Sequence, residues 1–216
     1  MRALTDAARP GTTAATRIIL LPAAYAAPED FVREGFAAAV RERALDIDLV
    51  FVALQFEHVT DRAGLARLHR EIVLPARAAH AAVWLGGISL GAYLALCYAA
   101  EYAHELAGLC LFAPYLGSHL ITGEIERAGG AGAWQAGAVE ADDEERRVWS
   151  FIRQRPEGLP LHLGLGREDR FARRHRLLAQ MLPAAEVDSV PGGHDWPTWR
   201  RLWENFLDAR FIHANG

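Results

Sequence analysis

Gly87-Ile88-Ser89-Leu90-Gly91 is the most informative stretch of the chain. Residues 81–86 before it form an apolar run with the composition of a short buried strand, and residues 92–100 after it have the composition of a buried helix. A Gly-x-Ser-x-Gly sequence between a strand and a helix can hold a serine hydroxyl above a sheet on a tight, strained turn. We therefore expect Ser89 to be a nucleophile; the alternative is a serine that only serves the turn.

The chain on both sides of this stretch alternates between short apolar runs and longer amphipathic ones. Strands are predicted at residues 17–21, 47–54, 81–86, 106–112, 159–163 and 185–190. Helices are predicted at residues 28–44, 61–80 with a bend or split near Pro75, 92–104, 142–153, 170–181 and 196–211. This alternation is typical of an α/β protein with a mostly parallel, doubly wound sheet of about six strands and helices on both faces.

Length and composition predict a short leader followed by a single domain, and the domain contains a cap insertion. Residues 1–16 mix Ala, Thr and Gly with Asp6, Arg9 and Pro10, which predicts a flexible leader and not a secretory signal. Residues 17–216 suffice for a single domain with a full core. Residues 114–148 begin with a glycine-rich run, so we expect a small cap insertion over a ligand site there; a plain surface loop is the alternative.

Charge, hydropathy and cysteine content indicate which partners and which cellular compartment to expect for the protein. A formal net charge of −4 without a basic excess argues against a nucleic-acid partner. No apolar run approaches the roughly 20 residues of a membrane span, so no membrane partner is expected. Cys97 and Cys110 lie in apolar segments, and together with the missing export signal they predict a cytoplasmic protein. A monomer and a homodimer remain equally open.

Two loops late in the chain carry the groups that would activate a serine. A serine hydroxyl needs a base that takes its proton and an acid that orients the base. Asp169 follows the fifth predicted strand and His194 follows the sixth, so both are expected at the carboxyl ends of strands, as Ser89 is. Glu168 is the alternative acid, whereas Asp195 is better explained as the N-cap of the last helix.

With these motifs, the chain resembles a compact α/β-hydrolase of the carboxylesterase and thioesterase kind over residues 17–212. Gly193-His194-Asp195-Trp196 is similar to the histidine loop of esterases related to S-formylglutathione hydrolases. The resemblance implies a Ser89, Asp169 and His194 triad that cleaves a small-molecule ester or thioester of a small to medium acyl group through an acyl-enzyme. It implies no cofactor, and the histidines have no spacing typical of a metal site.

Two backbone N–H groups should bind the oxyanion that forms in such a reaction. One is that of Leu90, directly after the nucleophile, and the other comes from the loop after the first strand. By position we assign the second donor to Ala24, with Tyr25 as the alternative. This loop has Pro22-Ala23-Ala24 where the family usually begins with His-Gly.

Three further side chains are candidates for contact with the substrate: Tyr25, His119 and Trp134. The main alternative to an enzyme is a non-catalytic ligand-binding or scaffold protein that has kept the fold, since a fold does not determine a function. The altered loop at Pro22 favours that alternative. Acyl transfer and carbon–carbon hydrolysis are also compatible with a triad.

Overall fold

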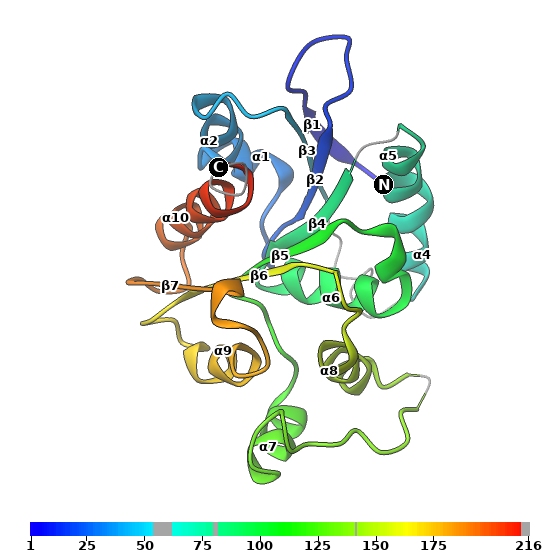
Figure 1. The fold of residues 1–216 in the computed structure, drawn as a ribbon, viewed down its shortest axis with the longest axis vertical. Helices are drawn as coiled ribbons and strands as arrows, with labels where there is room; N and C mark the ends of the chain where they lie inside the picture. The colour runs from blue at the N-terminus through cyan, green and yellow to red at the C-terminus, as the bar shows by residue number, and fades with distance from the viewer. Residues whose placement is uncertain (54–61, 80–81, 141, 213–216) are drawn as a thin grey trace.

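A seven-stranded sheet forms the centre of the computed structural model, which describes residues 1–53, 62–79, 82–140 and 142–212 (Figure 1). The strands are β1 (Ala3–Asp6), β2 (Thr16–Leu21), β3 (Ile47–Val52), β4 (Ala82–Ile88), β5 (Gly108–Phe112), β6 (Leu161–Gly166) and β7 (Val187–Val190). Their order in the sheet is β1-β3-β2-β4-β5-β6-β7, and every pair is parallel except β1 with β3. The mostly parallel sheet is confirmed, and the six predicted strands are β2 to β7.

The first strand, β1, corrects the prediction of a loose leader over residues 1–16. Ala3 to Asp6 pair antiparallel with β3, so the sheet has one strand more than expected. All six residues of β3 are buried, and β1 supplies the neighbour that this strand needs at its outer edge. The alternating exposure of β1 and its four-residue length explain why composition alone did not reveal it.

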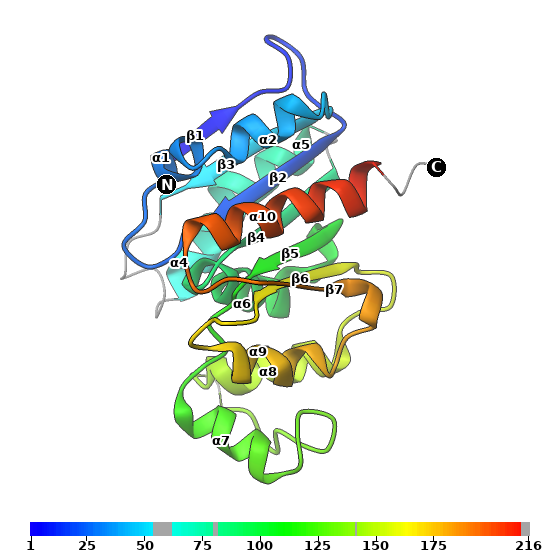
Figure 2. The same ribbon diagram turned by 90° about the vertical axis from the view of Figure 1, so that its left-hand side faces the viewer.

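Helices cover both faces of the sheet, as predicted (Figures 1 and 2). One face carries α1 (Pro28–Arg33), α2 (Phe36–Glu42) and α10 (Trp196–Leu207), and α10 ends in a π-helical turn at Asp208–Ile212. The other face carries α4 (Arg62–Leu68), α5 (Leu74–Ala78), α6 (Leu90–Tyr102), α8 (Glu144–Gln154) and α9 (Ala172–Ala179). A π-helical segment, His69–Val73, joins α4 to α5 just before Pro75, where the bend was expected. No helix within the described ranges is long and apolar enough to cross a bilayer.

The helix predicted at residues 28–44 is interrupted at Gly35. Gly35 has φ of +83°, and the space where its Cβ would lie is filled by the guanidinium of Arg200. The same guanidinium donates a hydrogen bond to the Glu34 carbonyl oxygen. A side chain from α10, more than 160 residues along the sequence, thus stabilises the break between α1 and α2.

The predicted cap, residues 114–148, forms α7 (His119–Arg127), a series of turns and the start of α8. α7 lies farther from the sheet than the other helices, beyond α8 and α9 (Figure 2). Ion pairs and hydrogen bonds fix it there: Glu145 accepts from the backbone N–H and the hydroxyl of Ser118 at 2.7 Å each, and Glu124 pairs with Arg146 at 2.5 Å.

Asp48 on β3 anchors the segment between β1 and β2. Its carboxylate, which is 3% exposed, accepts hydrogen bonds from Ala8 N at 2.8 Å, Ala14 N at 3.2 Å and the Arg17 guanidinium at 3.2 Å. Burial raises the pKa of Asp48, but these hydrogen bonds outweigh burial and hold the pKa below its usual value.

We expect Asp48→Ala to lower the free energy of unfolding by about 3 kcal/mol, because it leaves the partly buried Arg17 guanidinium and two N–H groups without their partner. Since the pKa is lowered in the folded state, this stabilisation is present at neutral pH and is lost as the pH falls through that lowered pKa. Urea unfolding at pH 7 and below about pH 4 measures both effects. Asp46→Ala is the control: its half-exposed ion pair with Arg9 should contribute less than about 1 kcal/mol. Equal losses in the two variants would contradict the anchoring role of Asp48.

Candidate active site

Ser89 lies on the turn between β4 and α6 in a strained backbone conformation. Its φ is +53° and its ψ is −111°, a region that non-glycine residues seldom occupy. The backbone around it offsets this strain: Ser89 N donates to the Phe112 carbonyl oxygen at 2.9 Å, and the N–H groups of Tyr93 and Tyr115 donate to the Ser89 carbonyl oxygen. The Gly-x-Ser-x-Gly stretch therefore forms the expected tight turn at the carboxyl end of a central strand.

Gly91 allows this turn to pack directly on the end of β2. A Cβ atom at Gly91 would lie 2.2 Å from the Leu21 carbonyl oxygen and 2.5 Å from that of Pro22, which is closer than any side chain tolerates. The close approach brings the loop after β2 beside the start of α6.

The side chains of Ser89, His194 and Asp169 form one hydrogen-bonded chain. His194 Nε2 lies 3.0 Å from Ser89 Oγ, and His194 Nδ1 lies 2.7 Å from Asp169 Oδ2. The three residues come from the ends of β4, β7 and β6. These three residues were predicted from separate loops, and Ser89 and His194 are 105 positions apart in the sequence. The fold brings their side chains into contact.

Asp169, and not Glu168, is the carboxylate that bonds His194. The Asp169 side chain is fully buried and also accepts from the Phe171 backbone N–H at 2.7 Å. Burial raises its pKa, but the hydrogen bonds from His194 and Phe171 outweigh burial, so the pKa lies below its usual value. Glu168 turns away to accept a hydrogen bond from Gly192 N. Asp195 caps α10 by accepting from Thr198 N at 3.0 Å, as predicted.

Two aromatic rings fix the imidazole of His194. Phe171 and Trp199 both meet it edge to face, with ring centroids 5.2 and 5.1 Å away. The His194 side chain is only 10% exposed as a result. The ring is therefore held in place by packing as well as by its two hydrogen bonds.

Leu90 and Ala24, the two predicted oxyanion donors, lie on the two segments that Gly91 brings together. Leu90 is the first residue of α6, where a backbone N–H has no partner within the helix. Ala24 is the second residue of a turn closed by Ala26 N donating to the Ala23 carbonyl oxygen at 3.1 Å. Tyr25, the third residue, has φ of +64°, which makes this a turn of type II character.

The three side chains predicted to contact the substrate have different surroundings. The Tyr25 side chain is 93% exposed. His119 is exposed at the start of α7 and lies against Arg174. Trp134 contradicts the prediction: it is 2% exposed, and its indole N–H donates to Glu124 at 2.8 Å. As the largest apolar side chain of the cap, it packs into the core instead of facing a ligand.

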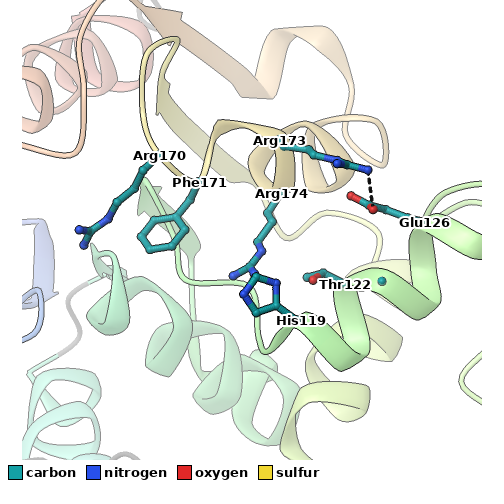
Figure 3. Close-up of a pocket in the computed structure, with 8 residues that line it drawn as sticks. His119, Thr122, Glu126, Arg170, Phe171, Arg173 and Arg174 are labelled. Carbon is teal, nitrogen blue, oxygen red and sulfur yellow. Dashed lines mark hydrogen bonds and ion pairs between the residues drawn. The ribbon is translucent and has the colours of Figure 1, made fainter.

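A pocket of about 340 Å³ lies between α7 and the start of α9 (Figure 3). We call it the basic pocket; it is lined by His119, Thr122, Gly123, Glu126, Arg170, Phe171, Arg173 and Arg174. Of these, only His119 was predicted from the sequence. The available signal was the presence of three arginines, Arg170, Arg173 and Arg174, among the five residues after Asp169, which predicts an ordinary solvated helix face as readily as a binding site.

Solved structures similar to this one extend over almost the whole chain. A ferulic acid esterase superposes with a TM-score of 0.67 at 12% identity, over 95% of this chain and 96% of that protein. An S-formylglutathione hydrolase from Staphylococcus aureus gives 0.63 at 11% identity, over 92% and 83%. An α/β-hydrolase enzyme from the metagenome of Mar Chica lagoon sediments gives 0.62 at 13% identity, over 99% and 95%. The chain thus has the α/β-hydrolase fold.

No protein-family model matches the chain, and no curated protein matches it in sequence.

The hydrogen bond between His194 and Asp169 predicts a spectroscopic signature. A proton on Nδ1 shared with a buried carboxylate should resonate downfield of the amide region in a proton NMR spectrum. We expect this signal to disappear in Asp169→Asn and to persist in Glu168→Gln. Loss of the signal in Glu168→Gln alone would show that Glu168 is the partner of His194.

Proposed function

We propose that the chain is a serine hydrolase that cleaves a carboxylic ester or thioester of a small to medium acyl group through an acyl-enzyme intermediate. The observation that carries this proposal is the hydrogen-bonded chain from Ser89 Oγ through His194 to Asp169, with links of 3.0 and 2.7 Å. A nucleophile, a base and an orienting acid in this arrangement fit acyl transfer to serine. The α/β-hydrolase fold of the chain, shared with esterases, is consistent with that chemistry.

The first half of the proposed reaction acylates Ser89. Ser89 Oγ attacks the carbonyl carbon of the ester or thioester while His194 Nε2 takes the hydroxyl proton. The resulting tetrahedral intermediate carries a negative charge on the former carbonyl oxygen. When it collapses, the bond to the leaving group breaks, and imidazolium Nε2 gives its proton to the departing oxygen or sulfur.

The second half repeats these steps with water. Water attacks the acyl carbon as His194 Nε2 takes one of its protons, and collapse of the second intermediate releases the acid and returns the proton to Ser89 Oγ. The proton transferred in the first half comes from Ser89 and the one in the second half comes from water, and His194 Nε2 carries each of them. The carboxylate of Asp169 stays ionised, as its lowered pKa favours, and stabilises the imidazolium of both halves.

Leu90 N and Ala24 N are the proposed donors to the oxyanion. The partial positive charge at the N-terminus of α6 would further stabilise a negative charge beside Leu90 N. Two aimed donors of this kind stabilise a charge that exists only in the intermediates and their transition states, so they raise kcat more than they lower KM.

We also propose that the protein works in a reducing compartment such as the cytoplasm. Cys97 and Cys110 are both buried free thiols. Burial raises the pKa of Cys97 to about 12, which keeps the thiol protonated and unreactive.

Labelling with a fluorophosphonate probe tests the proposed nucleophile. We expect covalent modification at Ser89, found by peptide mapping, and turnover of p-nitrophenyl esters or acyl thioesters. His194→Ala and Ser89→Ala should each reduce kcat by about 10⁴-fold or more while the far-ultraviolet circular dichroism is unchanged. An unlabelled Ser89 in folded protein, without turnover, would favour the non-catalytic ligand-binding alternative.

Replacement of Ala24 by proline tests the second oxyanion donor. Proline is favoured at the second position of a type II turn, so Ala24→Pro should keep the loop but remove the N–H. We expect kcat to fall by about 10²–10³-fold with little change in thermal stability. Ala24→Gly keeps the N–H and should retain most activity. Full activity in Ala24→Pro would transfer the role to Tyr25 N.

A further inference from the structure

The basic pocket carries an excess of positive charge that the protein itself leaves uncompensated. Of its three arginines, only Arg173 has an ion pair among the described residues, with Glu126 at 2.8 Å. Arg170 and Arg174 have no carboxylate partner in that part of the chain. Their guanidinium carbons instead lie 4.8 and 5.8 Å from the centre of the Phe171 ring.

Arg174 is held in position but retains free hydrogen-bond donors. It is half-buried, its Nη1 donates to the Gly117 carbonyl oxygen at 3.4 Å, and its Nη2 lies 2.6 Å from His119 Nδ1. A guanidinium has five N–H donors, so these contacts leave further N–H groups for a ligand. Planar guanidinium groups match the geometry of a carboxylate, to which they donate two hydrogen bonds at once.

The basic pocket is also connected directly to the triad. Phe171, which forms part of its wall, packs edge to face against His194, and the Phe171 N–H donates to Asp169. On the opposite side, the segment after β5 runs from Tyr115, whose N–H bonds to the Ser89 carbonyl oxygen, to Gly117, which accepts from Arg174. Figure 3 shows Phe171 between Arg170 and Arg174, with His119 against Arg174.

We propose that the basic pocket binds a carboxylate of the substrate through Arg170 and Arg174, so that the enzyme prefers esters or thioesters that carry a free carboxylate. This inference rests on the proposed hydrolase function and adds the class of substrate to it. The carboxylate can belong to the acyl part or to the leaving part of the substrate, and the experiment below distinguishes the two.

The test uses two matched pairs of esters that differ in charge. p-Nitrophenyl hydrogen adipate and p-nitrophenyl methyl adipate differ by a carboxylate on the acyl part; para-acetoxybenzoate and its methyl ester differ by a carboxylate on the leaving part. We expect kcat/KM of the wild type to be about tenfold or more higher for the acid of one pair, as a charge-assisted hydrogen bond would give. The pair that shows this preference identifies the end of the substrate that enters the basic pocket.

Arg174→Gln and Arg170→Gln should remove most of this preference, because KM should rise much more for the acid than for the methyl ester. Arg176→Gln is the matched control, because it removes the same charge from the exposed side of α9 outside the basic pocket. Its preference should equal that of the wild type.

The outcomes separate the two proposals. Turnover of both methyl esters without any preference for the acids would overturn the carboxylate site and leave the hydrolase function standing. A preference lost equally in Arg176→Gln would also overturn the site, because it would reflect net charge alone. Absence of turnover with all four esters, together with an unlabelled Ser89, would overturn both proposals.

Discussion

The close packing of the turn at Ser89 against the end of β2 is the constraint on which the candidate site depends. At Gly91 the backbone of α6 approaches the Leu21 carbonyl oxygen within a distance that excludes a Cβ atom. This contact places the segment of Leu21 and Pro22 directly against the start of α6, next to the strained Ser89 backbone. The absence of a side chain at Gly91 therefore allows the turn that carries the Ser89 hydroxyl to pack against the end of β2.

The parallel sheet supplies the other two members of the hydrogen-bonded chain. β6 and β7 are neighbours, so the loops that follow them run side by side, and Arg167 N and Glu168 N donate to carbonyl oxygens of Val190 and Gly192. These backbone bonds join the loop of Asp169 to that of His194, in addition to the hydrogen bond between the two side chains. Both this backbone pairing and the Asp169 carboxylate therefore help to position the imidazole.

Local sequence patterns were sufficient to predict the elements that are apolar throughout or end in a distinctive loop. They predicted six strands and the turn at Ser89, and they selected Asp169, the carboxylate that bonds His194. Local patterns could not predict contacts between distant segments: Arg200 bonds the chain at the break before Gly35, and β1 pairs with β3, which is more than 40 residues away along the sequence. Trp134 was misjudged because a lone aromatic residue in a glycine-rich run gives no sign of what it packs against.

The pairing of β1 with β3 has a consequence for the behaviour of the protein in concentrated solution. Without β1, the backbone groups along one side of β3, an apolar Ile-Asp-Leu-Val-Phe-Val strand, would be free to pair with a strand of another molecule. β1 presents a short edge of four residues with alternating exposure in its place. The N-terminal segment therefore covers an edge of the sheet that would otherwise be open to pairing with another molecule.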